Sequence, residues 1–267
     1  MKTHLFAATA LAAAALLAGC SGGAGGNNST AAAHASADLV KSAQALQAKL
    51  GAPGEKAEMP SADDPDVRAF DAQAEKALTA LGTPAMPVQG LDSYERLCGP
   101  AANITAAYVS VGVGPIGSGG LPMDDQAKVA KMNANATRYL GQMLTPLLYS
   151  AHCTAVHMPA IEKDLATKDL SGKTGAVDKI RGGALSQAGG LFQMAASSDI
   201  KPDQRQRVVD LLTRDVGDFA VALSQAQRQQ LTSIVDQAAA ASPDVKAKAD
   251  AMKASIAKAP CGKLCSA

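Results

Sequence analysis

The chain has 267 residues, with 25 Lys and Arg against 24 Asp and Glu, so its formal net charge is only +1. This balance gives no electrostatic footprint for nucleic acid, and we therefore expect no nucleic-acid partner. Aromatic residues make up 3% of the chain and Trp is absent, which argues against a groove that stacks bases or sugars. The Ala-rich apolar fraction favours helices, and the length suits one large domain or two small ones.

The first residues have the pattern of an export signal. Lys2 precedes an apolar run from Leu5 to Ala18, which is too short to cross a bilayer as a helix. The sequence Leu17-Ala18-Gly19-Cys20 then resembles the lipobox of bacterial lipoproteins. The resemblance implies cleavage before Cys20 and acylation of its thiol and amine. An ordinary secretory signal followed by a chance cysteine is the alternative.

The resemblance also implies a location. In that family Asp after the lipidated cysteine favours the inner membrane, and Ser21 stands at this position here. We therefore expect a lipid-anchored protein of the bacterial envelope, on the inner leaflet of the outer membrane and facing the periplasm. The predicted organisation is a signal peptide over 1–19, a lipidated cysteine and flexible tether over 20–37, a helical domain over 38–260 and a cysteine-containing tail over 261–267.

Helical periodicity dominates the rest of the chain. Asp64 before Pro65 predicts a capped helix start, and we expect Pro146 and Pro159 to kink or split the longest helix. The segment 101–114 could continue as helix or form a strand through the alternating Val109, Val111 and Val113, and we expect helix. The predicted helices cover 37–50, 65–81, 92–98, 124–169, 176–196, 202–223, 225–241 and 243–258. The predicted fold class is all-α, an antiparallel helical bundle of one or two sub-bundles, stapled by disulfides.

The cysteine count supports an oxidising compartment. Without Cys20, four cysteines remain, and an even set in an exported protein indicates two disulfides. Four cysteines allow three pairings. We favour Cys98–Cys153 between helical segments and Cys261–Cys265 within the tail, whereas both alternatives would tie the tail to the body.

Residue patterns that suggest chemistry are weak. His152, Cys153 and His157 are candidate metal ligands. However, a spacing of five residues places the two histidines about 140° apart around a helix, so we predict no metal site. The sequence Gly112–Gly117, GVGPIG, matches a dinucleotide motif without the helix that should follow. We read the histidines and acidic residues as linker, cap or solvated positions. No cofactor and no catalytic residue is predicted.

Two further features concern packing and partners. Gly182, Ser186 and Gly190 lie four residues apart, and we expect this stripe of small residues to pack against a neighbouring helix unless the segment is a loop.

The sequence Leu223-Ser224-x-x-Gln227 is similar to the L-T-x-x-Q motif of small periplasmic chaperones, which are all-helical dimers with a concave client-binding face. A simple capping box is the alternative reading.

The predicted function follows from these points. We expect a non-catalytic protein-binding or structural role toward another envelope protein, with a chaperone-like client binder as the alternative. We predict that the protein is not an enzyme. The expected partner surface is one exposed apolar patch beside the helices over 200–235, where Gln and Arg border Leu and Val faces. The sequence does not indicate which residues of this surface would bind the partner.

Overall fold

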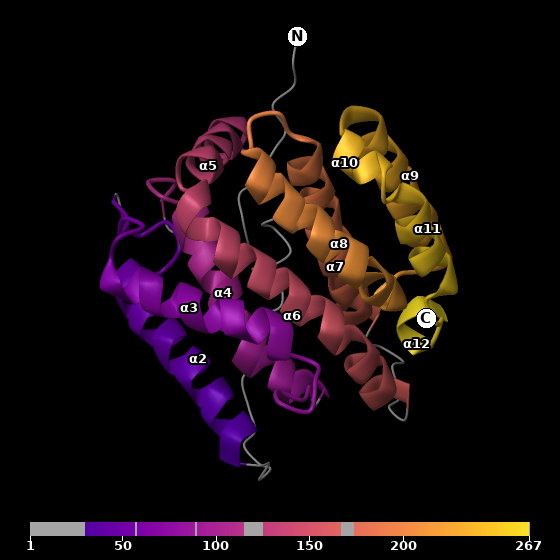
Figure 1. Ribbon diagram of the computed structural model, residues 1–267, viewed down its shortest axis with the longest axis horizontal. Helices are drawn as coiled ribbons and strands as arrows, with labels where there is room; N and C mark the ends of the chain where they lie inside the picture. The colour runs from indigo at the N-terminus through magenta and orange to yellow at the C-terminus, as the bar shows by residue number, and fades with distance from the viewer. Residues whose placement is uncertain (1–29, 57, 89, 115–124, 167–173, 267) are drawn as a thin grey trace.

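The computed structural model describes residues 30–56, 58–88, 90–114, 125–166 and 174–266. Over these ranges the chain forms helices and no strand, which confirms the predicted all-α antiparallel bundle (Figure 1). The export signal, the lipobox with Cys20 and the first part of the predicted tether lie outside the described residues. No helix within the described ranges is long and apolar enough to cross a membrane.

The N-terminal helices are α2 (Thr30–Leu50), α3 (Pro65–Ala80) and α4 (Gly90–Val109). Helix α2 buries Leu39, Leu46 and Leu50 along one face, as the periodicity predicted. It begins at Thr30 rather than near residue 37, so the predicted tether is too long at this end. The segment was read as a tether because its residues are small, but its alanines are also the strongest helix formers.

Helix α4 passes through Gly99 and Pro100 without ending. The helix predicted over 92–98 is too short at both ends, because α4 begins at Gly90 and ends at Val109. The helix expected over 101–114 is confirmed only as far as Val109, where α4 ends. The Val-rich alternation that follows does not form a strand, and Val111 and Val113 are instead buried in a turn.

The predicted long helix over 124–169 is two helices, α5 (Gln126–Arg138) and α6 (Leu140–Ala166). The break falls at Tyr139, not at Pro146 or Pro159, which both lie inside α6. Tyr139 adopts φ −102° and ψ 14°, and its ring packs against the ring of Tyr108 on α4 with centroids 5.6 Å apart.

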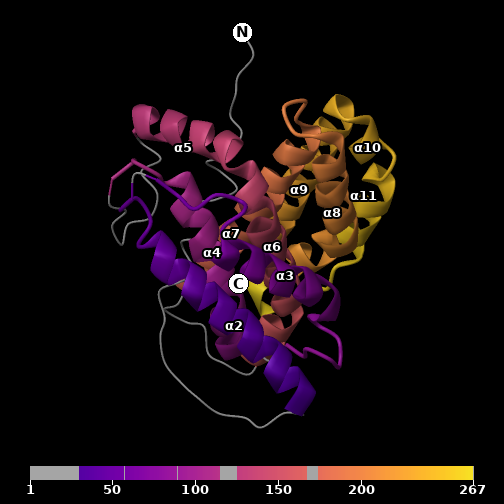
Figure 2. The same ribbon diagram turned by 60° about the vertical axis from the view of Figure 1, so that its left-hand side comes forward.

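Helix α5 is also fixed by the end of α4. The side-chain amide of Asn135 donates hydrogen bonds to the carbonyls of Val109 and Val111, at 2.8 and 2.9 Å. These bonds satisfy carbonyls that the end of α4 would otherwise leave without partners. Tertiary contacts therefore set this break. Figure 2 shows α5 lying across one end of the bundle.

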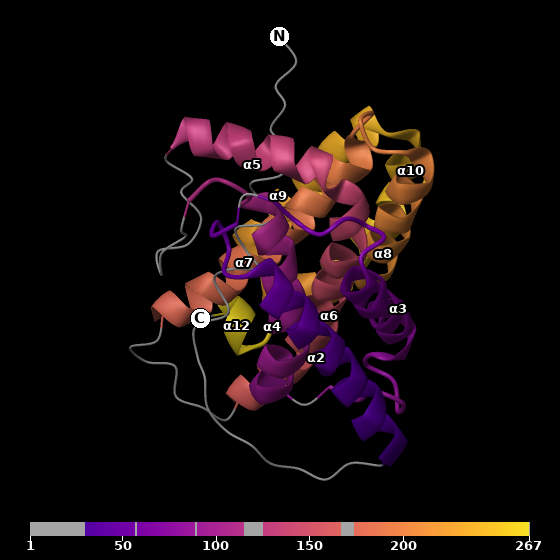
Figure 3. The same ribbon diagram turned by 90° about the vertical axis from the view of Figure 1, so that its left-hand side faces the viewer.

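The C-terminal half contains α7 (Thr174–Ala196), α8 (Pro202–Ala222), α9 (Gln225–Ala241), α10 (Pro243–Lys246), α11 (Ala249–Lys258) and α12 (Lys263–Ser266). The helix predicted over 243–258 is divided into α10 and α11 by a turn at residues 247 and 248. Helix α8 packs on α6, α7 and α11, and α7 packs on α9. Figure 3 shows α8 beside α6.

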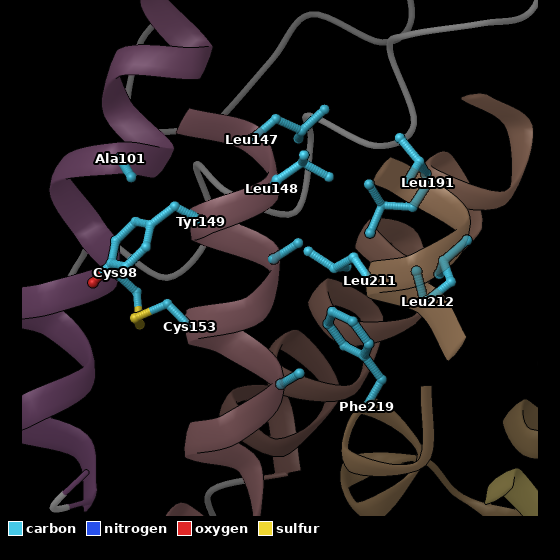
Figure 4. Close-up of a cluster of buried hydrophobic side chains, with 14 of the residues drawn as sticks. Cys98, Ala101, Leu147, Leu148, Tyr149, Cys153, Leu191, Leu211, Leu212 and Phe219 are labelled. Carbon is cyan, nitrogen blue, oxygen red and sulfur yellow. A yellow bond between two sulfur atoms is a disulfide. The ribbon is translucent and has the colours of Figure 1, made fainter. Parts of the chain in front are cut away.

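Helix α6 connects the two groups of helices. It packs on α3 and α4 on one side and on α8 on the other, and it is buried on nearly all faces between Met143 and His157. Figure 4 shows this arrangement, with Cys98 and Ala101 on one side of α6 and Leu211 and Phe219 on the other. The buried apolar side chains form one continuous cluster, so the two groups share a single core.

Helix α7 is continuous through its glycines, so the loop alternative is wrong. The close approach to a neighbouring helix occurs beside the predicted Gly182/Ser186/Gly190 stripe, at Gly189. A Cβ at Gly189 would lie 3.6 Å from Cδ1 of Ile234 on α9. At Gly182 a Cβ would meet no described atom within 4 Å, so this glycine does not serve close packing.

Candidate functional site

The structure joins Cys98 to Cys153 and Cys261 to Cys265, which confirms the predicted disulfide pairing. The two bonds differ in their surroundings. Cys98 and Cys153 connect α4 to α6 and are 1% and 0% exposed. Cys261 is exposed at the surface, while Cys265 is buried. The first disulfide therefore lies inside the core, and the second opens to solvent on one side.

A buried histidine lies against the Cys98–Cys153 disulfide. Nδ1 of His157 is 3.6 Å from Sγ of Cys98 and 3.8 Å from Sγ of Cys153. The same nitrogen lies 2.7 Å from the carbonyl oxygen of Cys153, to which it donates. Nε2 therefore carries the lone pair, and it accepts from the hydroxyl of Ser93 at 3.1 Å. Burial lowers the pKa of His157 to about 4, so the imidazole is neutral near pH 7.

This arrangement bears on nucleophilic and metal chemistry. A serine hydroxyl that donates to a histidine is the first half of an acyl-transfer site. However, Ser93 is buried and Nδ1 of His157 is held by a backbone carbonyl instead of a carboxylate. Cys98, Cys153 and His157 also have the spacing of metal ligands, but metals bind thiolates, and these two sulfurs are bonded to each other.

A second buried polar group links α6 to α8. Nδ1 of His152 lies 2.8 Å from Oδ2 of Asp215, and the two side chains are 5% and 1% exposed. Arg214 donates to the same carboxylate through Nε, at 2.7 Å, and through Nη2, at 3.2 Å. Nearby, burial is the main cause that raises the pKa of Asp218, and the charge of Asp215 adds to it.

The interpretation of the histidines and acidic residues as linker, cap or solvated positions is therefore wrong for His152, His157 and Asp215. A signal for Asp215 was present in the sequence. It lies four residues after Leu211 and four before Phe219, on the apolar face of α8. A carboxylate at an apolar position is rarely buried without a partner, which points to a polar contact with another helix.

Other acidic residues do serve as caps. Asp64 accepts from the backbone N–H of Asp66 at the start of α3, and Asp125 accepts from that of Lys128 at the start of α5. Ser224 and Gln227 form a complete capping box at α9, which accounts for this pair without a chaperone motif. Gly112 and Gly114 have positive φ values of 61° and 94°, and the last three residues of the GVGPIG sequence, 115–117, lie outside the described residues.

Asp71 on α3 is an acidic residue in an unfavourable environment. Its Oδ1 is buried without a hydrogen-bond partner among the described atoms. Burial raises the pKa of Asp71 to about 6, with a further contribution from the nearby charge of Glu75, while Arg207 opposes the shift. Glu75 itself is paired with Arg207 and accepts from Thr145.

The C-terminal segment is held against the bundle by three side chains, which we call the tail clamp: Glu162, Arg181 and Arg228. Glu162 on α6 accepts from the backbone N–H groups of residues 263 and 264, the latter at 2.8 Å. Arg181 on α7 donates to the carbonyl of residue 264. Arg228 on α9 donates to the carbonyls of residues 259 and 260, at 2.6 and 2.7 Å.

A surface pocket of about 500 Å³ lies beside the tail clamp. Its lining comes from α9, α11 and the tail disulfide and comprises Gln225, Arg228, Gln229, Thr232, Ile256, Ala257, Cys261 and Cys265. The pocket thus combines hydrogen-bonding side chains with the exposed residue Cys261. No local pattern in the sequence predicts this pocket, because the residues that line it are far apart along the chain.

The helices over 200–235 do not present their Leu and Val residues as an exposed apolar patch. These residues are buried, and they include Val208, Leu212, Leu231 and Val235. The Gln and Arg side chains expected at its border line the pocket on α9 instead. No family model, curated protein or solved structure matches this chain.

Proposed function

We propose that this protein is a lipoprotein of the bacterial envelope, anchored through lipidated Cys20, whose helical domain has a non-catalytic protein-binding or structural role. The lipobox at residues 17–20 supports the anchor, and Ser21 supports the outer membrane, with the domain facing the periplasm. Several acyl chains on one cysteine would hold the protein stably, since one chain alone binds a membrane only weakly.

The observation that carries the binding role is the face of α9 around the pocket. Gln225 and Gln229 are exposed there, while Leu231 and Val235 on the opposite face are buried. Amide side chains that rim a hollow suit hydrogen bonding to a partner's backbone or polar groups. His152 and His157 are the side chains best suited to acid–base chemistry, but both are buried and hydrogen-bonded to side chains of neighbouring helices.

Two experiments test this proposal. Replacement of Cys20 by Ala should release the protein from the membrane fraction, and mass spectrometry of the mature N-terminus should find a lipid on Cys20 in the unaltered protein. An unmodified Cys20, or cleavage elsewhere, would contradict the anchor.

For the binding role, a photo-cross-linking residue at position 229 should capture one envelope protein in intact cells. The same residue at exposed position 126 on α5 is the matched control. Equal capture at both positions, or at neither, would contradict a partner at the pocket. A chaperone-like client binder, the alternative function, would suppress aggregation of two unrelated unfolded proteins at near-stoichiometric amounts, which a specific partner-binding domain would not.

A further inference from the structure

The two cysteines of the tail disulfide differ in their exposure to solvent. Cys261 is exposed and Cys265 is 7% exposed, and both border the pocket beside α9. In thiol–disulfide exchange an incoming thiolate must reach one sulfur in line with the bond, so access selects which sulfur is attacked. The tail disulfide offers such access at Cys261, whereas Cys98 and Cys153 are enclosed by the core.

The tail keeps its position without help from the disulfide. The tail clamp binds backbone groups on both sides of Cys261, through Arg228 before it and through Glu162 and Arg181 after it. The disulfide closes a separation of only 4 residues, so opening it returns little chain entropy. The two cysteines should therefore stay close together after reduction, which makes the bond easy to form again.

The charges around the two sulfurs differ. The guanidinium of Arg228 binds the two carbonyls directly before Cys261, and nearby cations favour the thiolate form of a cysteine. Glu162 and Arg181 carry opposite charges and both bind the backbone directly before Cys265, so it is the burial of Cys265 that favours its neutral thiol. After reduction Cys261 is thus suited to act as the nucleophile and Cys265 as its resolving partner.

We propose that Cys261–Cys265 is a redox-active disulfide that accepts electrons from the dithiol of another protein. A partner thiolate attacks Sγ of Cys261, the bond between Cys261 and Cys265 breaks, and Cys265 leaves with the electron pair and takes a proton from water. The second partner thiolate then attacks the partner sulfur of the mixed disulfide and releases Cys261. The partner is oxidised to a disulfide, and the tail is reduced to two thiols.

The exchange is stoichiometric, with one oxidation per chain, and it does not depend on the proposed binding role. It is tested with the full chain and two probes, dithiothreitol and reduced thioredoxin, followed by alkylation and peptide mass spectrometry. The tail disulfide should be reduced at least 100-fold faster than Cys98–Cys153. A thioredoxin variant that lacks its second active-site cysteine should accumulate a mixed disulfide with the oxidised chain through Cys261, because nothing then resolves the intermediate.

Alkylation of the reduced protein distinguishes a redox-active disulfide from one that is only exposed. Cys261 should be alkylated at least tenfold faster than Cys265 at neutral pH, and Arg228→Gln should slow this alkylation several-fold and shift its pH profile upward. Gln229→Ala, from the same pocket wall, is the matched control and should leave the profile unchanged. Equal alkylation of the two cysteines, no effect of Arg228→Gln, or a tail disulfide that thioredoxin reduces only in urea would overturn the proposal.

Discussion

The carboxylate of Asp215 on α8 meets the imidazole of His152 on α6 inside the core, with 2.8 Å between Oδ2 and Nδ1. This contact joins the helix shared by both halves of the bundle to the principal helix of the C-terminal half. A buried polar pair of this kind contributes little net free energy while intact, but loss of one member leaves the other without compensation.

We therefore predict that Asp215→Leu lowers the free energy of unfolding by about 3 kcal/mol. Addition of His152→Phe to this variant should recover part of the loss, because an apolar pair replaces the orphaned imidazole. Urea unfolding of the single and double variants measures both effects. Asp210→Asn, at an exposed position on the same helix, is the control and should change stability by less than about 0.5 kcal/mol.

The second prediction concerns acid sensitivity at His157. Its pKa is lowered from 6.5 to about 4 by burial, so the unfolded chain binds a proton more readily than the folded one as the pH falls below 6.5. This contribution to stability is present above pH 6.5 and is lost progressively toward pH 4.

Between pH 7 and pH 5 the loss should reach about 2 kcal/mol, from the usual 1.36 kcal/mol for each pKa unit. Urea unfolding at a series of pH values measures it, with His157→Gln compared against the unaltered chain. The variant should show a shallower loss over this range. An identical pH dependence in both proteins would mean that His157 is not the buried neutral group described above.

Asp71 should behave in the opposite direction. Its pKa is raised to about 6 by burial, so the stabilising contribution is complete only below about pH 3.8 and is lost as the pH rises through 6. At pH 7 the charged carboxylate is a cost, and we expect Asp71→Asn to stabilise the protein by about 1 kcal/mol, a figure reduced for the partial exposure of the group. The gain should vanish at pH 4, as thermal unfolding at both pH values would reveal. A gain that persists at pH 4 would assign it to something other than charge.

The glycines of α7 give a contrasting pair of predictions. Gly182→Ala should stabilise the protein by about 0.5–1 kcal/mol, because a Cβ there meets open space and alanine favours helix. Gly189→Leu should destabilise it by about 1–3 kcal/mol, because the new side chain would enter the contact with Ile234. Thermal unfolding of the two variants checks the sign of each change. Two changes of the same sign would show that the packing of α7 on α9 has been misassigned.

The elements that the sequence predicts well depend on neighbouring residues. Asp64 with Pro65, and Ser224 with Gln227, mark helix starts that the structure confirms, because capping acts within one turn. The pairing of the tail cysteines is equally local. The all-α class follows from periodicity repeated over the whole chain, so errors at single helix ends do not change it.

The features that escaped prediction depend on residues far apart in the chain. The break at Tyr139 requires the end of α4, which supplies Tyr108 and the carbonyls bound by Asn135. His152 and Asp215 are separated by 63 positions. The residues around each are apolar, which indicates burial but does not indicate the partner. The tail clamp likewise combines α6, α7 and α9, so the pocket beside it emerges only when these helices are packed.

The Cys98–Cys153 bond also determines how the protein would respond to a pulling force. It bridges a separation of 55 residues, which at about 3.4 Å per residue corresponds to roughly 190 Å of extended chain. When the two ends are pulled apart, tension passes through the covalent bond, so the intervening segment, with α5 and the first half of α6, bears no load. Under oxidising conditions the chain would lengthen only by the segments outside this bridge, and reduction would add the remaining length in a separate step.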